Sequence, residues 1–344
     1  MAPKRNYWRE RFTILEQSQH TRSTEFYQEL EEAYKKTMLE IEKDIARWYA
    51  RFAANEEISL AEAKRMLKTD ELAEFKWTVK QYIQYGEANA LNQQWMKQLE
   101  NASARVHISR LESLRLQLQQ HVEALYGGRI ESFERFMKEV YQDQYYHTAF
   151  EVQKAFNVGF TFQMIDEARL NMIISKPWTA DSRTFSQRIW RDRGLLIDTL
   201  QKELTLSIAK GEGPRRVITV IKNKFDTSRS NAARLVQTEQ AFFSSAANKD
   251  SFNALDVEKF ENIATLDRKT SETCQTMDGK VFEMKDFEVG TTAPPFHARC
   301  RTTTAPHFDD DVDFGSRAAR DNDGKIYYIP GNIKYKEWHK RFVK

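Results

Sequence analysis

The chain has 344 residues, of which 30% are charged and 40% hydrophobic, with twelve glycines and seven prolines. This length excludes one small domain, and the composition is typical of an ordered, helix-rich protein and excludes a disordered one. The net charge is only +3, but residues 25–75 carry thirteen acidic and eight basic side chains, whereas residues 176–234 carry six acidic and thirteen basic.

The basic stretch suits a partner that carries phosphates or an acidic surface, although a solvated helix face explains it equally well. No apolar run approaches the about 18–20 residues that span a bilayer. The N-terminal sequence MAPKRNYWRERF also lacks the apolar segment of a signal peptide. We therefore expect the protein to stay in the cytosol in which it is made.

Residues 1–175 are predicted to form an elongated helical region. No proline occurs between Pro3 and Pro177, and glycine is rare there, so the residues that most often break helices are nearly absent. Apolar residues spaced by three or four predict a helix of roughly forty residues, about 60 Å long, that ends near Phe52. They are Leu30, Tyr34, Met38, Ile41, Ile45, Trp48 and Phe52.

Shorter helices follow this long one. A helix is expected to begin at Asp70, and residues 88–125 read as a second long helix that Gly127 and Gly128 end. The segment 129–174 is rich in aromatic residues, which predicts packing between helices and argues against a platform for stacking bases.

Residues 176–250 are predicted to form a basic helical hairpin or linker region. A helix over 215–225, a turn at 226–228 and a helix over 229–249 would give a loose helix-turn-helix arrangement. Such an arrangement could present cations to DNA, but a plain helical hairpin is the commoner origin of this pattern. The candidate contacts to phosphates are Arg215, Arg216, Lys222, Lys224, Arg229 and Arg234.

Residues 251–344 are predicted to form a small α+β domain with a C-terminal tail. The fold class is therefore α+β overall, with long helices in the N-terminal two-thirds. Asp278-Gly279 predicts a hairpin turn, and either Asp267 or Thr270 is expected to cap a short helix. The β-like segments are 260–266, 281–282 and 302–304.

Cys274, His297 and Cys300 are arranged like part of a metal site, because His-x-x-Cys brings two metal-ligating side chains close together. A structural zinc site needs a fourth ligand, and the candidates are His307, Asp267 and Glu239. Two other interpretations fit equally well: a Cys274–Cys300 disulfide formed after release from the cell, and two buried thiols that pack near each other. A cysteine nucleophile assisted by His297 fits less well, because the histidine lies in a turn-like segment three residues from Cys300.

Three linked motifs carry a family resemblance: RLVQTE at 234–239, TLDRKTSETCQTMDGKVF at 265–282 and APPFHARCRTTTAP at 293–306. In this order and spacing they resemble the C-terminal domain of phage head morphogenesis proteins, the minor head proteins similar to phage Mu protein F. The resemblance is closest over 213–306, and the helical front and the tail are similar to the longer members from phages of Gram-positive bacteria. Gln237 departs from the pattern, because the family often has an arginine before the Thr-Glu pair.

The resemblance implies a non-catalytic minor structural protein of the phage head that acts in procapsid assembly near the portal. It would lie inside the head of the virion, after assembly in the cytoplasm of the bacterial host. Its partners would be the portal protein, other capsid or scaffolding components, and phage DNA bound without sequence specificity, with no membrane partner. Structural zinc is the cofactor that the cysteines and histidine suggest.

Two other functions stay open. The C-terminal domain could be an enzyme or effector-type module that modifies protein or nucleic acid, although the sequence lacks a Gly-rich phosphate loop, a nucleophile elbow and a dinucleotide fingerprint. The residues that would carry such chemistry are Arg234, Glu239, Cys274 and His297. Alternatively, segment 213–248 could belong to a sequence-specific DNA-binding regulator, which requires its basic residues on one recognition surface.

Overall fold

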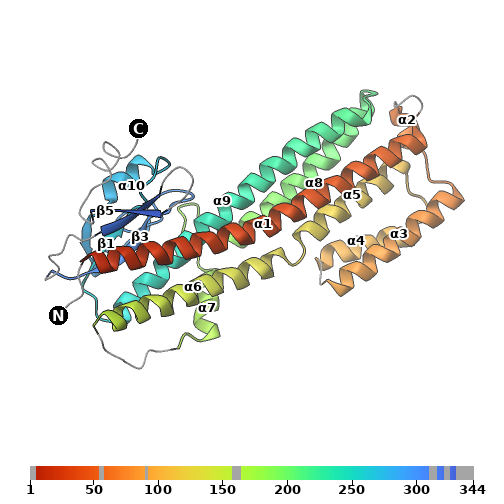
Figure 1. Cartoon of the computed structure of the whole chain (residues 1–344). Helices are drawn as coiled ribbons and strands as arrows, with labels where there is room; N and C mark the ends of the chain where they lie inside the picture. The colour runs from red at the N-terminus through yellow and green to blue at the C-terminus, as the bar shows by residue number, and fades with distance from the viewer. Residues whose placement is uncertain are drawn as a thin grey trace. The chain divides into compact units, whose positions relative to one another are not determined.

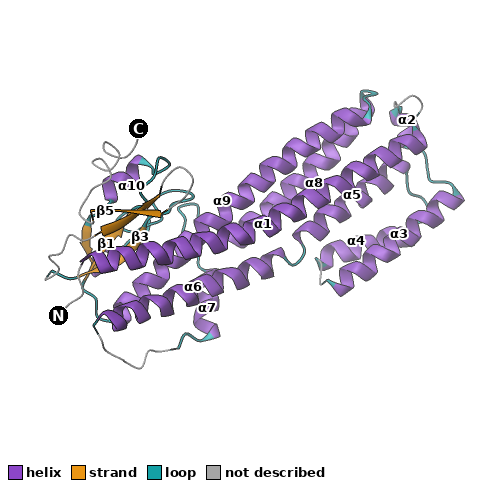
Figure 2. Cartoon of the chain, in the orientation of Figure 1, coloured by secondary structure: helices purple, strands orange, loops and turns teal. Residues whose placement is uncertain are grey.

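The computed structural model describes residues 5–53, 58–89, 92–156, 164–309, 316–320 and 326–330. Figure 1 labels the helices and strands, and Figure 2 shows that the strands all come from the C-terminal third of the chain. The predicted α+β class, with long helices ahead of a small sheet, is therefore confirmed. None of the helices in these ranges combines the length and the apolar character that a membrane span requires.

The helices are α1 (Arg5–Phe52), α2 (Leu60–Ala63), α3 (Thr69–Ala88), α4 (Gln93–Ala104), α5 (Arg110–Tyr126), α6 (Arg129–Ala155), α7 (Glu167–Ser175), α8 (Phe185–Ala209), α9 (Pro214–Ala254), α10 (Glu272–Met277) and a 3-10 turn η1 (Met284–Asp286). The strands are β1 (Lys259–Ile263), β2 (Val281–Glu283), β3 (Thr303–His307), β4 (Ser316–Arg320) and β5 (Ile326–Pro330).

The chain divides into two compact units, and each unit is built from segments that are far apart in the sequence. Unit 1 contains residues 1–27, 134–176 and 233–344, and unit 2 contains residues 28–133 and 177–232. Helices α1, α6 and α9 each contribute residues to both units. The units therefore do not follow the consecutive regions 1–175, 176–250 and 251–344.

Helix α9 contradicts the predicted helix-turn-helix arrangement, because Pro214–Ala254 is one helix of 41 residues. The turn expected at 226–228 does not form. Thr227 donates its hydroxyl hydrogen bond to the Asn223 carbonyl at 3.0 Å, inside the helix. Buried Ser228 hydrogen-bonds through its hydroxyl to Tyr126 at 3.1 Å and to the Asp192 carboxylate. These tertiary partners override the turn propensity of the local sequence.

The single helix predicted over 88–125 is also wrong, because α4 ends at Ala104 and α5 begins at Arg110. Ser109 caps α5 by accepting a hydrogen bond from the Glu112 amide at 3.2 Å. Helices α3 and α4 then form an antiparallel pair with its own apolar core. That core contains Phe75, Val79, Trp95, Leu99, Ala102 and Ile108.

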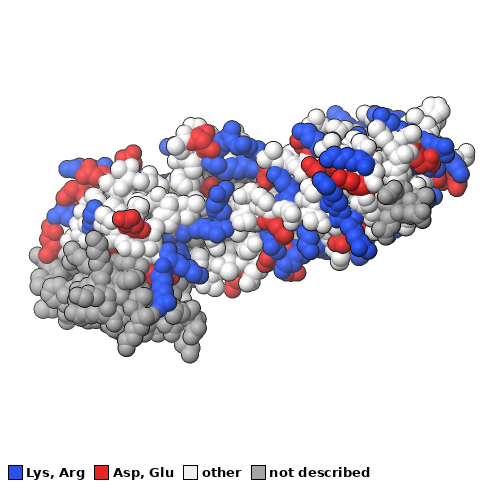
Figure 3. All heavy atoms as spheres, turned by 90° about the horizontal axis from the view of Figure 1, so that it is seen from above, with Lys and Arg blue, Asp and Glu red and all other residues white. Residues whose placement is uncertain are grey.

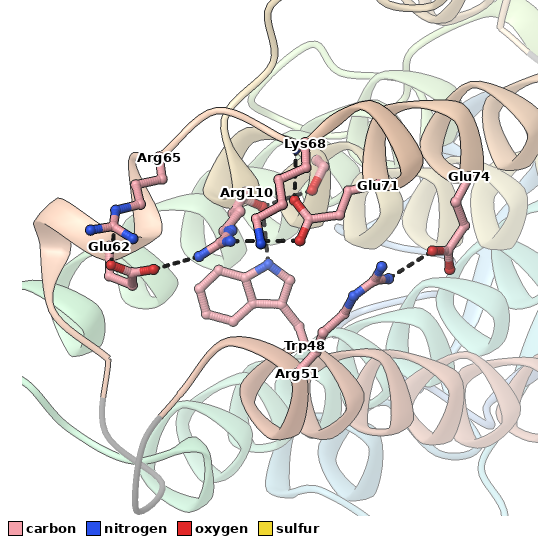
Figure 4. Close-up of polar contacts among 9 residues, drawn as sticks. Trp48, Arg51, Glu62, Arg65, Lys68, Glu71, Glu74 and Arg110 are labelled. Carbon is pink, nitrogen blue, oxygen red and sulfur yellow. Dashed lines mark hydrogen bonds and ion pairs between the residues drawn. The ribbon is translucent and has the colours of Figure 1, made fainter.

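Arg110, the first residue of α5, lies in a buried polar network of unit 2 (Figure 4). Its guanidinium donates to Glu62 at 2.6 Å and lies 3.5 Å from a Glu71 oxygen. The same group stacks on the ring of Phe52, with its carbon 4.4 Å from the ring centre. A cation at a helix N-terminus faces an unfavourable dipole, so the two carboxylates offset the cost of this placement.

The aromatic residues of segment 129–174 mostly pack as predicted. Phe133, Phe136, Tyr141 and Tyr145 are buried, whereas Phe150 is 56% exposed. The remaining part of this prediction, on Phe160 and Phe162, lies outside the described residues. Helix α6 therefore provides core side chains to both units.

Unit 1 contains a three-stranded antiparallel sheet with the order β2-β1-β3. Phe260 of the central strand lies opposite Phe282 in β2 and Pro306 in β3. The turn predicted at Asp278-Gly279 forms, but it links α10 to β2 and is not a hairpin turn between two strands: Gly279 adopts a φ of +73°, and the Asp278 carboxylate accepts a hydrogen bond from the Ala264 amide at 2.9 Å. A separate antiparallel pair joins β4 to β5.

The N-terminal end of α1 packs into the core of this sheet, which the sequence had not predicted (Figure 1). Trp8 and Phe12 are fully buried in a cluster with Phe252 of α9 and Phe260 of β1. Arg9, also buried, donates to the Glu261 carboxylate through Nε at 3.2 Å and through a second, shorter contact. The first helix and the C-terminal sheet are therefore parts of one folding unit.

Candidate functional site

The three sequence motifs meet at one place in unit 1. The backbone amide of Arg299 donates to the Thr238 hydroxyl at 3.1 Å, which links the third motif to α9. The Thr265 hydroxyl donates to the Arg301 carbonyl at 2.8 Å, which links the second motif to the third. Segments that are separate in the sequence thus form one connected site around α10.

The residue that caps α10 differs from the two that the sequence suggested, Asp267 and Thr270. Ser271 caps the helix, because its hydroxyl accepts a hydrogen bond from the Cys274 amide at 3.2 Å. Asp267 instead accepts from the Arg301 guanidinium, at 2.8 Å for one of two contacts, and from the Lys269 amide at 2.9 Å. Burial disfavours the charged form of Asp267, but the hydrogen bond and charge of Arg301 outweigh it and lower the pKa of this carboxyl.

Cys274, His297 and Cys300 lie together in space, as the sequence predicted. The Cys274 sulfur is 3.1 Å from Nε2 of His297 and 3.6 Å from the Cys300 sulfur. Both cysteines are buried, next to Ala264 and Phe296, whereas the histidine is partly exposed. The three potential ligand atoms all lie within 4.8 Å of one another.

The backbone near His297 fixes the direction of its ring. Nδ1 lies 2.8 Å from the Ala298 carbonyl oxygen. A carbonyl can only accept, so Nδ1 carries the hydrogen, and in the neutral ring Nε2 presents its lone pair to Cys274 and Ser271. Arg299, two residues later, adopts a φ of +60°, which turns the chain back towards Cys300.

The two neighbouring thiols shift each other's pKa in opposite directions. A hydrogen bond from the Cys300 thiol lowers the pKa of Cys274 to about 5, although desolvation by burial opposes this shift. The same bond raises the pKa of Cys300 well above its usual value, and burial acts in the same direction. Cys274 is therefore the more acidic thiol of the pair.

None of the three candidate fourth ligands joins the cluster. Among the described residues, the group of His, Cys, Asp and Glu side chains that could hold an ion contains only Cys274, His297 and Cys300. Asp267 is bound to Arg301, and His307 lies 3.7 Å from the Asp309 carboxylate. Among the described residues, none of the expected fourth ligands, His307, Asp267 and Glu239, belongs to this cluster.

A shallow hollow, partly open to solvent, borders Cys274 and His297. Its lining combines hydroxyl groups with cationic side chains. These residues are Thr265, Lys269, Thr270, Ser271, Arg299, Arg301 and Thr302. Both cysteines are free thiols in this structure, so the disulfide is not formed.

The six basic residues singled out in the sequence do not form one surface. With about 100° between successive residues of a helix, Arg215, Lys222 and Arg229 follow one stripe of α9, while Lys224 points about 180° away from Arg215. Carboxylates already pair with two of the six: Arg229 lies 3.2 Å from Glu31, and Arg216 lies 3.0 Å from Glu212. The hairpin on which a sequence-specific DNA-binding regulator was expected to present these residues does not form, because Pro214–Ala254 is one helix.

Charges of both signs are interspersed on the face drawn in Figure 3. Part of the difference in charge between segments 25–75 and 176–234 is cancelled inside unit 2, where the Arg229–Glu31 pair joins α9 to α1. Arg215, Arg216 and Lys222 remain exposed near the start of α9. They are the part of the predicted basic region that a partner could contact.

Several site residues were missed in the sequence. Ser271 contacts Nε2 of His297 at 2.8 Å, and Arg301 binds Asp267. A signal for Ser271 did exist, because a serine three residues before Cys274 has the spacing of an N-cap to the third helical position. No local pattern could have indicated the Arg301 pairing, because the two partners are 34 residues apart.

Residues 198–305 match the family model described as phage Mu protein F like protein. The matched range contains Thr238, all of α10, His297 and Cys300, and ends within β3. Comparison with curated proteins and with solved structures finds no match to the chain. The family match confirms the resemblance carried by the three motifs and supports a protein of phage head morphogenesis.

Proposed function

We propose that this protein is a non-catalytic structural component of a phage head that acts in procapsid assembly beside the portal and is carried in the virion. The observation that carries the proposal is the family match over residues 198–305. Within that range, hydrogen bonds from Arg299 to Thr238 and from Thr265 to Arg301 join the motif segments into one module. A module held together in this way suits a role in binding.

The helical unit 2 supplies the surface for a large partner in this proposal. It is built from α3, α4, α5 and α8 with parts of α1, α6 and α9, and it includes exposed aromatic side chains such as Trp77, which is 62% exposed. An exposed Trp is a common anchor in protein interfaces. The portal protein is the partner that we assign to this unit.

The portal contact is tested by co-expressing the full chain with the portal protein of the same phage and purifying through the portal alone. We expect the chain to co-purify, and density for it to appear on the portal in cryo-electron microscopy. Trp77→Ala should weaken the complex, whereas Phe150→Ala, at a site 56% exposed in unit 1, is the matched control. A chain that never co-purifies with the portal or enters procapsids would refute the proposal.

DNA contact is proposed for Arg215, Arg216 and Lys222, which are exposed near the start of α9 and would neutralise phosphates without reading bases. Replacing all three with glutamine should reduce affinity for duplex DNA. It should also reduce the slope of log K against log salt by about 0.9 for each phosphate that the protein no longer neutralises. The control replaces exposed Lys36, Lys80 and Lys97, which changes the net charge equally. Equal reductions in both triple variants would show that net charge alone is responsible and would contradict DNA binding at α9.

A second candidate function, cysteine-based catalysis, has one specific observation in its favour. The Cys274 sulfur lies 3.1 Å from His297, and the pKa of Cys274 is lowered to about 5, as in a thiolate nucleophile. The Cys274 side chain is buried, however, and Nδ1 of His297 is bound to a backbone carbonyl and not to a carboxylate. Rapid, selective alkylation of Cys274 by iodoacetamide in the native, metal-free protein would favour catalysis, and protection of this thiol would argue against it.

A further inference from the structure

We propose that Cys274, His297 and Cys300 bind one zinc ion through three protein ligands, with the fourth coordination position open to the hollow lined by Lys269 and Arg299. The inference does not depend on a role in the phage head. It concerns only the module formed by α10, the loop before β3, and the neighbouring part of α9.

The separations of the ligand atoms suit a tetrahedral ion. With zinc–sulfur and zinc–nitrogen distances of about 2.3 and 2.0 Å, a regular tetrahedron separates two sulfurs by roughly 3.8 Å and a sulfur from a nitrogen by roughly 3.5 Å. The Cys274 sulfur is 3.6 Å from the Cys300 sulfur and 3.1 Å from Nε2 of His297. These two separations are within about 0.4 Å of the tetrahedral values, and the third pair, the Cys300 sulfur and His297, lies within 4.8 Å. Binding zinc therefore requires the Cys300 and His297 side chains to approach each other.

The orientation of His297 is the one that a metal ligand requires. Its Nδ1–H points to the Ala298 carbonyl at 2.8 Å, so the lone pair of Nε2 faces the cysteines. Ligating histidines almost always donate their other N–H to a carbonyl or carboxylate in this way, which fixes the tautomer and makes the free nitrogen more basic. In the neutral ring, three electron-pair donors converge on one point, and a cation there would interact favourably with all of them.

The surroundings favour deprotonated cysteines. Lys269, Arg299 and Arg301 line the hollow next to Cys274, and positive charge near a thiol favours the thiolate that binds metals. Two thiolates and a neutral imidazole also balance the charge of a divalent ion. Two sulfurs and one imidazole nitrogen form a ligand set that selects zinc over magnesium or calcium, which prefer oxygen.

The open position follows from the same geometry. No other His, Cys, Asp or Glu of the described ranges lies in the cluster, and the hollow beside it is partly open to solvent. Three protein ligands with water or an anion in the fourth position is an arrangement that zinc commonly adopts. The ion would tie α10 to the 296–300 loop, which the Arg299 amide already links to Thr238.

The first experiment measures metal content and affinity in the untagged full chain, purified under reducing conditions. We expect one zinc per chain, displaced by a strong chelator together with a fall in the melting temperature. Cys274→Ser, Cys300→Ser and His297→Ala should each weaken zinc binding by at least about tenfold. His107→Ala removes an exposed histidine of unit 2 and should leave zinc binding unchanged.

The second experiment replaces zinc with cobalt, whose absorption spectrum reports both ligand type and coordination number. We expect the visible bands of a four-coordinate ion and a near-ultraviolet sulfur-to-cobalt band that loses about half its intensity in either cysteine variant, in proportion to the thiolates. Adding azide should shift the visible bands, because the anion enters the open position. These readings on the wild-type chain remain decisive if a variant fails to fold.

Three results would overturn the inference. One is a fully reduced chain that binds no stoichiometric zinc. Another is zinc binding that survives in all three ligand variants, or a cobalt complex without the sulfur band. The third is a cobalt spectrum that azide leaves unchanged, because a fourth protein ligand would then close the site.

Discussion

The ion pair between Arg9 and Glu261 is predicted to anchor the first helix to the C-terminal sheet. Arg9→Met leaves the Glu261 carboxylate buried without its guanidinium partner. The two side chains are 6% and 2% exposed, so this is a buried ion pair. Removing one partner of such a pair costs about 3–5 kcal/mol of folding free energy. We expect Arg9→Met to lower the free energy of unfolding of unit 1 by an amount in that range.

The assay is urea denaturation of the full chain, followed by fluorescence, because Trp8 lies fully buried beside this pair. The double variant Arg9→Met, Glu261→Met should recover much of the loss, since it removes both charges together. Their coupling energy measures how much of the effect belongs to the pair.

The matched control is Arg51→Met. Arg51 pairs with Glu74 at 2.7 Å, but these side chains are 43% and 61% exposed. Water screens such a pair, so its loss should cost no more than about 1 kcal/mol. Equal, small losses for Arg9→Met and Arg51→Met would refute the conclusion that α1 is anchored by a buried charge.

Three further predictions concern single positions. Asp267→Asn should make the melting temperature depend less on pH under acidic conditions. The pKa of the Asp267 carboxyl is lowered from its ordinary value of 3.8, so its contribution to stability is present above that pH and is lost as the pH falls through the lower folded value. Melting temperatures measured from neutral pH to about pH 2 test this. Gly279→Ala should lower the free energy of unfolding by about 1 kcal/mol, because φ is +73° there. Gly194→Ala, inside α8, should raise it by roughly 0.5–1 kcal/mol. Denaturation experiments in which both variants change the free energy of unfolding in the same direction would contradict this expectation. Arg110→Met should cost about 1–3 kcal/mol, because Glu71, 9% exposed, loses a charged partner and keeps only the Lys68 amide, while the more exposed Glu62 keeps Arg65; hydrogen exchange that stays slow in α3 would count against it.

The features that the sequence revealed are those that depend on local or nearby residues. The scarcity of proline and glycine before Pro177 and the three-or-four spacing of apolar residues predicted long helices, and α1 extends over 48 residues. Short β-like segments predicted a small sheet, and Asp278-Gly279 predicted a turn before β2, although this turn follows α10 and does not form a hairpin. Each pattern reflects backbone preference and burial along a single element, which neighbours in the sequence largely determine.

The candidate site was partly predictable for the same reason. His297 and Cys300 are three residues apart, and Cys274 belongs to the same linked motifs, so their proximity could be inferred. The fourth ligand could not, because whether Asp267 is available depends on Arg301, which reaches it only in the folded chain. The Ser271 contact with His297 likewise depends on how α10 meets the loop before β3.

The sequence by itself determined the α+β class, the helical front and the identity of the cysteine and histidine cluster. Only the tertiary structure decided that α9 continues through residues 226–228, since buried partners of Ser228 outweigh a turn propensity. It alone placed Arg9 on Glu261, 252 residues away, and so joined the first helix to the three-stranded sheet. Contacts between such distant residues produce no periodic pattern in the sequence. They depend on the free energy of the whole packed unit and not on any one segment.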